Sequence, residues 1–506
     1  MSGRLERAVP WVIALIALVA RLIPGPRTID DAYITFRYAQ NLISGAGFVY
    51  NAGERVLGTT TPLYTLLMSL LSIPVGGASA PFPYLALVAN AVLGAASCWL
   101  LIRLGSHLGY PIAGSITAVV WALAPMSVTF AIGGMETSLF VLLILATFYF
   151  YYSQRPTAGA LMAALCLLTR PDGILFIGPL ALERARQAWL TKHERTIPAF
   201  GWSEGMAFLL PLAAWTAFAG LYFGNPLPNS IAAKISAYHL PPNAALIRLL
   251  QHYATPFLGQ LTFGNTWIPI GLVLFPFLFG LGALTVLRRR SDLWPIFAAP
   301  WIYLIVFSAF NPLIFRWYLA PPLPFYFLGI ALGMERLGTD LRTRLVPLGM
   351  GLAAAILTLH GWVLHPSHGL DRPAPDMAYT KLELLYIEVA DDLKQRLEPG
   401  QTVAAGDIGA LGYYTGAHML DTLGLVSPDA SAYYPLDAAY YVINYAIPPK
   451  LISDLKPDYV VLLEVYGRKG LLQDEAFVRA YRLIETLPTD IYGSRDMFVF
   501  ARAIDK

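Results

Sequence analysis

Residues 28–64 read TIDDAYITFRYAQNLISGAGFVYNAGERVLGTTTPLY, and this polar stretch lies between two long apolar runs. One apolar run precedes it at 9–24, and another follows at 83–102. A helix needs roughly 17 to 25 mainly apolar residues to cross the hydrocarbon core of a bilayer. The pattern therefore predicts a loop at a membrane surface, and this loop opens with the acidic pair Asp30 and Asp31.

The composition of the whole chain agrees with a membrane setting. Of the 506 residues, 56% are hydrophobic and only 13% are charged, whereas about a quarter of the residues in an average globular protein are charged. The net charge of +3 gives no case for nucleic-acid binding. Cys98 and Cys166 lie inside apolar runs, where a thiol behaves as a small hydrophobe, so we assign them no disulfide, metal or catalytic role.

Apolar runs long enough to cross a bilayer recur along the first 365 residues. The shorter run 61–74 is bounded by prolines and predicts a re-entrant or interfacial helix. The run 158–182 predicts two short crossings that are broken at 171–173. The total is about eleven transmembrane helices, with candidate runs at 9–24, 83–102, 111–131, 138–153, 158–182, 204–223, 266–287, 293–310, 313–333 and 345–364.

Basic loops predict the orientation of these helices. Segments 183–195, 287–290 and 335–344 carry the most Lys and Arg, and the positive-inside rule assigns them to the cytoplasm. We expect an uncleaved first helix with a cytoplasmic N-terminus. An odd number of crossings then predicts that the loop 25–60 and the segment after residue 365 lie outside.

Two domains are expected. The first, 1–365, is a transmembrane domain that carries the candidate catalytic loop 25–60. The second, 366–506, has the composition of a soluble, extracytoplasmic α/β domain. Its amphipathic helix and two of its strands are expected at 381–400, 401–407 and 457–464.

The acidic pair of the first loop has two interpretations. A carboxylate beside a membrane is costly unless it is paired or functional, and a general base at a membrane-facing site would deprotonate an acceptor hydroxyl or hold a cation that does so. Alternatively, Asp30 and Asp31 cap a helix that starts at Ala32. The spacing alone does not choose between these two.

The stretch DDAYITFRYAQNLISGAGFVYNAGERVLGTTTPL (30–63) resembles the first outer loop of the GT-C superfamily of membrane glycosyltransferases. It is most similar to the branch that contains the mycobacterial arabinofuranosyltransferase adding terminal β-1,2-arabinofuranose. The similarity continues through GGMETSLF (133–140), LTRPDGIL (168–175), FRWYLAPPLP (315–324), and DIGALGYYTG with DTLGLVSP (407–428).

This resemblance implies a polytopic α-helical, GT-C-like membrane protein of a bacterial cytoplasmic membrane. It also implies an inverting transfer of a sugar, arabinofuranose being one candidate, from a polyprenyl-phosphate donor to a glycan, glycolipid or protein acceptor on the outer face. In the superfamily an acidic residue of this loop is the proposed base, and the resemblance places Asp30 slightly ahead of Asp31 in that role.

Three further residues are candidates for binding the donor. Arg316 opens an apolar segment at the outer surface, where a guanidinium either clamps a phosphate diester or snorkels to lipid headgroups. In the loop 225–240, Asn229 and Lys234 lie on an expected amphipathic helix. Lys234 either contacts phosphate or is simply a solvated interfacial lysine.

Glu136 and Arg170 belong to the other matched stretches. Arg170 is either a substrate-binding residue or the partner of Asp172 in an internal ion pair that fixes the helix break. Glu136 either binds acceptor hydroxyls or holds its own loop.

No histidine has metal-ligand spacing, so we predict no zinc site. An acidic outer site permits a divalent cation without requiring one. Asp407 and Asp421 flank glycine-rich turns and are interpreted as turn or capping residues. The tyrosines of the tail either stack on sugar rings or belong to the core: Tyr413, Tyr414, Tyr433, Tyr434, Tyr440 and Tyr441.

Two other functional classes compete with an enzyme. A secondary transporter would show paired halves with helices broken at matching positions, and the sequence shows none. A non-catalytic protein that binds an envelope glycan or serves as a scaffold would not need the acidic pair. Transfer from a labelled donor distinguishes it from an enzyme.

Overall fold

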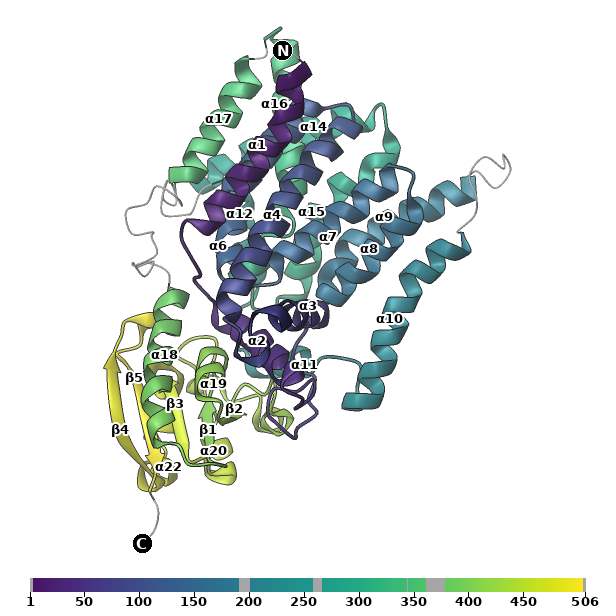
Figure 1. Ribbon diagram of the computed structural model, residues 1–506. Helices are drawn as coiled ribbons and strands as arrows, with labels where there is room; N and C mark the ends of the chain where they lie inside the picture. The colour runs from purple at the N-terminus through teal and green to yellow at the C-terminus, as the bar shows by residue number, and fades with distance from the viewer. Residues whose placement is uncertain (1–2, 191–200, 258–265, 344, 361–377, 504–506) are drawn as a thin grey trace. The chain divides into compact units, whose positions relative to one another are not determined.

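The computed structural model describes residues 3–190, 201–257, 266–343, 345–360 and 378–503 (Figure 1). The chain divides into two compact units, each built from three separate segments. We call them the helical unit, 1–27, 86–214 and 242–370, and the sheet unit, 28–85, 215–241 and 371–506. The first polar loop therefore folds together with the C-terminal segment. The predicted domain boundary at residues 365 and 366 lies outside the described residues.

The helical unit is built from apolar helices. Helices α4 (Phe82–His107) and α10 (Trp202–Phe223) have most of their residues in it. The others are α1 (Gly3–Leu22), α5 (Pro111–Leu123), α6 (Pro125–Ile132), α7 (Thr137–Tyr152), α8 (Pro156–Thr169), α9 (Ile174–Leu190), α12 (Ala244–Ala254), α14 (Trp267–Leu287), α15 (Trp294–Phe310), α16 (Leu323–Asp340) and α17 (Leu345–His360).

Among the described residues, five helical segments are long and apolar enough to cross a membrane. The bent pair α5 and α6 makes a sixth if it is one span. The total of about eleven crossings stays a prediction. The five segments are Phe82–His107, Trp202–Phe223, Trp267–Leu287, Ser291–Phe310 and Arg316–Asp340, and the shorter apolar helices are Ala8–Leu22, Pro62–Val75, Thr137–Tyr152, Pro156–Thr169 and Leu345–Ile356.

Prolines set the helix breaks. The predicted break at 171–173 is confirmed, because α8 ends at Thr169 and α9 begins at Ile174. Proline disfavours a helical conformation in the residue before it, and the residue before Pro171 is extended. The same constraint breaks the run 111–131, for which we predicted a crossing without a break. Pro125 starts α6 after a bend of 47°, so the predicted crossing, if it is one span, is a broken one.

The basic segment 183–195, predicted as a loop, is helical up to Leu190, and 191–195 lies outside the described residues. Ion pairs explain why the charged residues extend the helix. Arg186 bonds to Glu183 one turn earlier, with Nε 2.7 Å from Oε2, and such i,i+3 pairs stabilise helices. Arg184 pairs with Glu204 of α10.

Helices α14 and α16 approach each other closely through glycines. A Cβ atom at Gly282 would overlap the carbonyl oxygen of Gly329, and one at Gly333 would overlap the carbonyl oxygen of Leu278. Small residues at such crossings let two membrane helices pack backbone against backbone. Gly280 also lies on α14, but a Cβ there would meet nothing within 4 Å.

We expect Gly282→Ala to destabilise the protein by about 1–3 kcal/mol, because the added methyl group overpacks the crossing of α14 and α16. The matched variant Gly280→Ala should change stability by less than about 1 kcal/mol. Thermal unfolding of the two purified proteins in detergent measures the difference. Equal losses in both variants would contradict this account of the packing.

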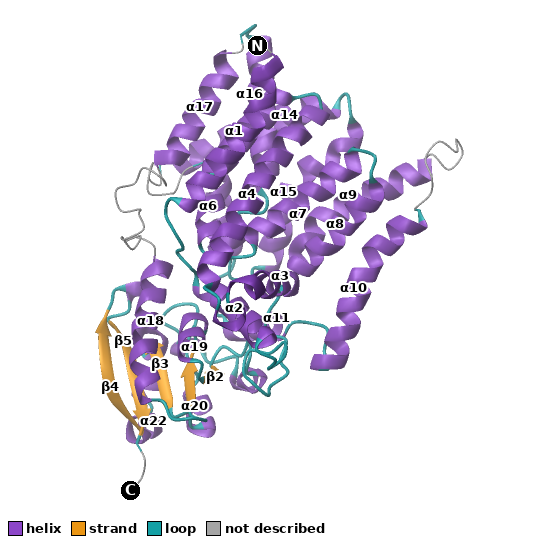
Figure 2. Ribbon diagram, in the orientation of Figure 1, coloured by secondary structure: helices purple, strands orange, loops and turns teal. Residues whose placement is uncertain are grey.

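Within its described residues, the sheet unit combines eight α-helices with one five-stranded sheet (Figure 2). The strands are β1 (Thr402–Ala405), β2 (His418–Asp421), β3 (Tyr459–Leu463), β4 (Tyr481–Pro488) and β5 (Asp496–Arg502). The helices are α2 (Asp30–Ile43), α3 (Pro62–Ser72), α11 (Asn229–Ala237), α18 (Ala378–Arg396), α19 (Gly409–Thr415), α20 (Pro449–Leu455), α21 (Glu464–Gly467) and α22 (Glu475–Ala480).

The strand order is β2-β1-β3-β5-β4. Strand β1 pairs in parallel with both β2 and β3, and β5 pairs antiparallel with β3 and β4. The predicted helix 381–400 and the predicted strands 401–407 and 457–464 are confirmed as α18, β1 and β3. The carboxyl ends of the three parallel strands meet at one edge of the sheet, and β1 leads there into Asp407.

Candidate active site

Helix α2 begins at Asp30 and not at Ala32. Its N-cap residue is Ile29, whose side chain makes no capping hydrogen bond. The capping interpretation of the acidic pair was therefore wrong. Asp30 and Asp31 occupy the first turn of the helix, where their charges meet the positive end of the helix dipole.

The carboxylate of Asp30 binds a different helix. Its Oδ2 accepts a hydrogen bond from Gly409 N at 2.9 Å, and its Oδ1 accepts one from Ala410 N at 2.7 Å. These are the first two residues of α19, so Asp30 satisfies two N–H groups that an isolated helix leaves without partners. The residue is only 7% exposed. Gly409 is required here, because a Cβ would overlap the Asp30 backbone.

Arg37 holds the other end of α19. It lies seven residues after Asp30, which is two helical turns and brings it back to the same face. Its Nη1 donates to the carbonyl oxygen of Gly412 and its Nη2 to that of Ala417, both at 2.6 Å. The guanidinium also stacks 4.3 Å from the ring centre of Tyr50. Arg37 is not among the predicted site residues, although its spacing of seven residues from Asp30 predicts a shared helix face.

Glu383 of α18 secures the start of α2. Its Oε1 accepts a hydrogen bond from the backbone N of Asp30 at 2.7 Å, while its Oε2 is buried without a partner. Burial raises the pKa of Glu383 well above its ordinary value, and the negative charge of Asp30 adds to the shift. Burial also raises the pKa of Asp30, with the charge of Asp407 as the next cause.

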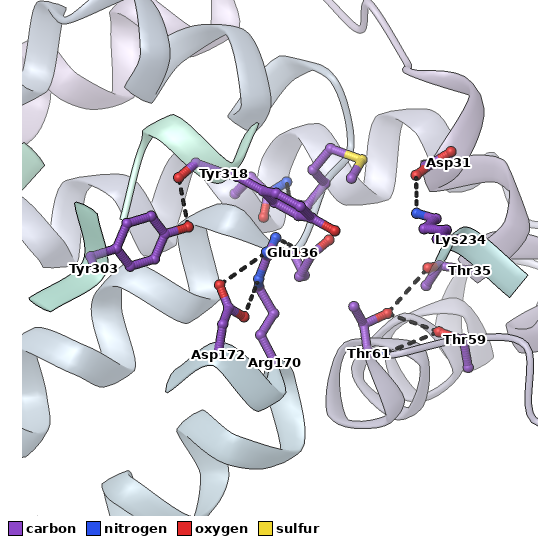
Figure 3. Close-up of polar contacts among 12 residues, drawn as sticks. Asp31, Thr35, Thr59, Thr61, Glu136, Arg170, Asp172, Lys234, Tyr303 and Tyr318 are labelled. Atoms are coloured by element: carbon purple, nitrogen blue, oxygen red, sulfur yellow. Dashed lines mark hydrogen bonds and ion pairs between the residues drawn. The ribbon is translucent and has the colours of Figure 1, made fainter. Parts of the chain in front are cut away.

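Asp31 has a different environment from its neighbour. Its Oδ2 lies 3.8 Å from Lys234 Nζ, and the two side chains are 33% and 25% exposed (Figure 3). One turn further along α2, the hydroxyl of Thr35 lies 3.4 Å from that of Thr61. Asp31 is thus a paired carboxylate that remains accessible to a hydroxyl-bearing molecule.

Lys234 and Asn229 both lie on the predicted helix, which is α11. Lys234 reaches Asp31, as described above. Asn229 has a structural setting, because its Nδ2 donates to the carbonyl oxygen of Gly424 at 2.6 Å and its backbone N donates to that of Leu57 at 2.8 Å. Its amide therefore ties α11 to two other segments of the sheet unit.

Asp421 and Asp407 differ from each other. Asp421 accepts hydrogen bonds from the backbone N of Leu423 and of Val426, at 2.9 and 3.1 Å, which confirms it as a turn residue. Asp407 is neither a turn nor a capping residue. Its Oδ2 accepts hydrogen bonds from the hydroxyls of Tyr386 and Tyr466, at 3.0 and 3.2 Å. Our interpretation of Asp407 was therefore wrong.

In the helical unit, Glu136 and Arg170 contact each other (Figure 3). Arg170 Nη1 donates to Glu136 Oε1 at 2.9 Å, and a bidentate pair at 2.9 and 3.1 Å joins Arg170 to Asp172. The guanidinium lies 4.5 Å from the ring centre of Tyr318. Arg170 therefore forms the predicted internal ion pair, and two carboxylates compensate its one positive charge.

Arg316 is exposed and begins the 3₁₀ helix η6 (Arg316–Leu319). In the part of the chain that the structure describes, its side chain makes no hydrogen bond or ion pair. Burial, and then the positive charge of Arg316, lowers the pKa of Arg248 on α12. The helical unit thus holds two arginines close enough to repel each other, of which only Arg316 was predicted as a site residue.

Metal-ligand clusters are not found among the residues that the structure describes: no group of three or more His, Cys, Asp and Glu side chains is placed to hold an ion. The expectation that a divalent cation is permitted gains no support from these residues.

Most of the tail tyrosines serve the core. Tyr434 and Tyr441 are buried, and the rings of Tyr413 and Tyr414 pack against Tyr33 of α2. For these four residues the structure supports the core interpretation. Tyr433 and Tyr440 are half-buried.

Comparison with known proteins places this geometry in a wider group. A family model described as a domain of unknown function (DUF8728) matches residues 376–500. The terminal beta-(1->2)-arabinofuranosyltransferase of Mycobacterium tuberculosis is 29% identical over 289 residues, which cover 53% of this chain and 43% of that protein. The chain therefore spans less than half the length of this curated relative.

Three solved structures share the fold. ArnT from Cupriavidus metallidurans, bound to undecaprenyl phosphate, has a TM-score of 0.58 and 13% identity over 99% of this chain and 97% of its own. The Archaeoglobus fulgidus oligosaccharyltransferase has a TM-score of 0.54 and 13% identity over 98% of this chain and 73% of its own. The mycobacterial arabinofuranosyltransferase AftD has a TM-score of 0.51 and 16% identity over 100% of this chain and 40% of its own.

The chain has the fold of the GT-C superfamily of membrane glycosyltransferases, and the resemblance found in its sequence is thereby confirmed. Within this superfamily, its sequence is similar to that of the mycobacterial terminal arabinofuranosyltransferase.

We expect Arg170→Lys to destabilise the protein by about 3–5 kcal/mol, because a lysine cannot make both the bidentate pair with Asp172 and the bond to the buried Glu136. Arg290 and Asp292 form the same Arg-x-Asp pair at an exposed position, with side chains 46% and 26% exposed. Arg290→Lys is the matched control and should cost about 0–1 kcal/mol. Thermal unfolding in detergent compares them, and a similar cost in both would show that the buried pair has no special structural part.

A pH series on Glu383→Gln tests the buried carboxyl. Its pKa is raised in the folded state, so the folded protein holds a proton that the unfolded chain releases above a pKa of about 4.3. Stability from this group is therefore lost as pH rises, and between about pH 5 and about pH 8 the wild type should lose more stability than the variant.

The control is Glu464→Gln, with the series extended below about pH 5, where we expect a pH dependence of the opposite sign. Hydrogen bonds from Arg468 hold the pKa of Glu464 below its ordinary value. This carboxylate stabilises the fold, and its contribution is complete above its unfolded pKa of about 4.3. The stability difference between wild type and Glu464→Gln should therefore grow as pH rises to about 5 and stay constant above it. If the stability of the wild type and that of Glu383→Gln changed equally with pH, the raised pKa of Glu383 would be contradicted.

Proposed function

We propose that this protein is an inverting glycosyltransferase that moves a sugar from a polyprenyl-phosphate donor to a glycan, glycolipid or protein acceptor. The observation that carries the proposal is the half-exposed Asp31, held beside Lys234 at the start of α2. Similarity to the arabinofuranosyltransferase favours arabinofuranose as the sugar. The ArnT structure, bound to undecaprenyl phosphate, favours a lipid-linked donor.

Asp31 is our candidate for the general base, in preference to Asp30. A base must reach the proton that it removes. Both carboxylate oxygens of Asp30 already accept hydrogen bonds from α19, and the residue is buried. Asp31 is open and adjacent to it. We therefore reverse the order in which the sequence placed the two residues.

The proposed reaction is a direct displacement at the anomeric carbon. Asp31 takes the proton of an acceptor hydroxyl, and the hydroxyl oxygen forms a bond to the anomeric carbon. The bond from that carbon to the phosphate oxygen breaks on the opposite face, so the configuration inverts. Polyprenyl phosphate leaves as an anion and needs no second acid, unlike the alcohol that leaves in glycoside hydrolysis.

The leaving phosphate calls for positive charge. Arg316 remains our candidate for this part, and Arg248 beside it is a second one, because their mutual repulsion is relieved when an anion binds. We no longer propose Arg170, Glu136 or Asn229 as substrate-binding residues: their polar groups are engaged in hydrogen bonds within the fold.

We also propose the setting of the reaction. The basic segments favour a cytoplasmic N-terminus in a bacterial cytoplasmic membrane, with the loop 25–60 and the domain 366–506 on the outer side. Donor and acceptor would then meet outside the cell membrane, where envelope glycans are built.

Asp31→Asn tests the proposal. Removing a general base should lower the transfer rate about 100- to 10,000-fold, while the melting temperature should change little because Asp31 is half-exposed. Transfer of radiolabelled arabinofuranose from its polyprenyl phosphate, by the purified full-length protein, provides the measurement. If the variant kept wild-type activity, Asp31 would not be the base.

Two controls accompany this experiment. Glu54→Gln changes another half-exposed carboxylate of the same loop and should retain activity. Asp30→Asn should lower the melting temperature, because it weakens the bonds to α19. A wild-type protein that binds glycan but transfers no sugar from any polyprenyl-phosphate donor would point to a binding protein instead. Mass analysis of copurifying lipid identifies the donor independently.

A further inference from the structure

Asp407 occupies a position in the sheet where ligands commonly bind. It lies two residues after the carboxyl end of β1. From β1 the chain runs through α19 to β2 on one side, and β3 pairs with β1 on the other side. In open α/β sheets, ligands bind beyond the carboxyl ends of the strands at such switch points.

The carboxylate of Asp407 is held in one orientation by hydrogen bonds to only one of its two oxygens. The hydroxyls of Tyr386 and Tyr466 both donate to Oδ2, and these tyrosines are buried and come from different helices, α18 and α21. In the part of the chain that the structure describes, Oδ1 makes no hydrogen bond. The residue is half-buried, so this oxygen is held in place and left available.

The hydrogen bonds of Asp30 bring Asp407 close to Asp31. Asp30 precedes Asp31 directly, and it binds the N–H groups of Gly409 and Ala410, which begin two residues after Asp407. The carboxylates of Asp31 and Asp407 therefore flank the contact between Asp30 and the start of α19. Burial raises the pKa of Asp407, and the negative charge of Asp31 adds to that shift, as expected for neighbouring acids.

We propose that Asp407 is an acceptor-binding residue, whose Oδ1 accepts a hydrogen bond from the sugar hydroxyl next to the one that Asp31 deprotonates. The ligand class is a sugar with two neighbouring hydroxyls. This inference rests on the proposed function. It also gives a role to the domain of unknown function at 376–500, which supplies the second carboxylate of the site.

The chemistry of the group suits this role. A carboxylate only accepts hydrogen bonds and a sugar hydroxyl can donate one, so the pair is complementary. A hydrogen bond to a charged acceptor is stronger and more directional than one between neutral groups. The two tyrosine hydroxyls prevent the carboxylate from rotating away, so Asp407 fixes which hydroxyl of the acceptor faces Asp31.

Asp407→Asn in the full-length protein tests this assignment through acceptor kinetics and acceptor binding. The probes are an arabinofuranose tetrasaccharide and the same compound lacking the hydroxyl next to the reacting one. For the variant we expect a KM for the tetrasaccharide at least about tenfold higher, with the KM for the polyprenyl-phosphate donor unchanged. Titration of the tetrasaccharide without donor should show the same loss of affinity.

The deoxy probe separates contact with substrate from a merely structural role. Wild-type protein should prefer the complete probe to the deoxy probe about tenfold, and Asp407→Asn should treat the two alike. Asp429→Asn changes an exposed carboxylate of the same domain and should keep the wild-type preference. Melting temperatures show whether each variant is folded, and Tyr466→Phe, which retains the carboxylate, is expected to lose only part of the preference.

The outcomes distinguish the two proposals. If the wild type transfers sugar and Asp407→Asn keeps the wild-type preference for the complete probe, the role of Asp407 is overturned. The proposed function is then unaffected. Suppose that the wild type binds the tetrasaccharide, that Asp407→Asn weakens this binding, and that the wild type transfers sugar from no donor. This result supports the acceptor-binding site and overturns the proposed function. If the wild type transfers sugar but neither binds nor uses the tetrasaccharide, the assignment of a sugar diol to Asp407 is overturned.

Discussion

The candidate site depends on the hydrogen bonds by which two side chains of helix α2 bind the backbone of helix α19. Asp30 binds the N–H groups at the start of α19, and Arg37 binds carbonyl oxygens at its end. Arg37 follows Asp30 by seven positions on α2, and α19 is itself seven residues long. Because both helices rise about 1.5 Å per residue, Asp30 and Arg37 are spaced to reach opposite ends of α19. Negative charge meets the positive end of the helix dipole, and positive charge meets the negative end.

This arrangement explains why two adjacent aspartates have different parts. The buried neighbour, Asp30, is used entirely for structure, and its position fixes that of Asp31, which stays open beside Lys234. The same contact brings the end of β1 close to the start of α2, and Asp407 with it. Preorganised groups of this kind are what catalysis by positioning requires, and here hydrogen bonds between segments far apart in the chain provide them.

Some of this could be predicted from local sequence, and some could not. Proline positions predicted the break after Thr169. The amphipathic pattern predicted α18, and strand-like runs bounded by turn residues predicted β1 and β3. The same prolines would have predicted the break at Pro125. The Arg-x-Asp sequence at 170–172 and at 290–292 gives the same local bidentate pair. Only the surrounding helices decide that the Arg170 pair is largely buried and that the Arg290 pair is more exposed.

The sequence by itself predicted a membrane protein with an acidic first outer loop, because apolar length and charge are local properties of the chain. Its motifs also predicted the GT-C fold. The tertiary structure alone decided which aspartate is open. It also decided that Arg37 is structural, and that Asp407 is a held carboxylate instead of a turn residue. Those roles depend on which backbone N–H, carbonyl or hydroxyl groups surround a side chain, and these groups come from segments more than 350 residues away for Asp30 and Arg37.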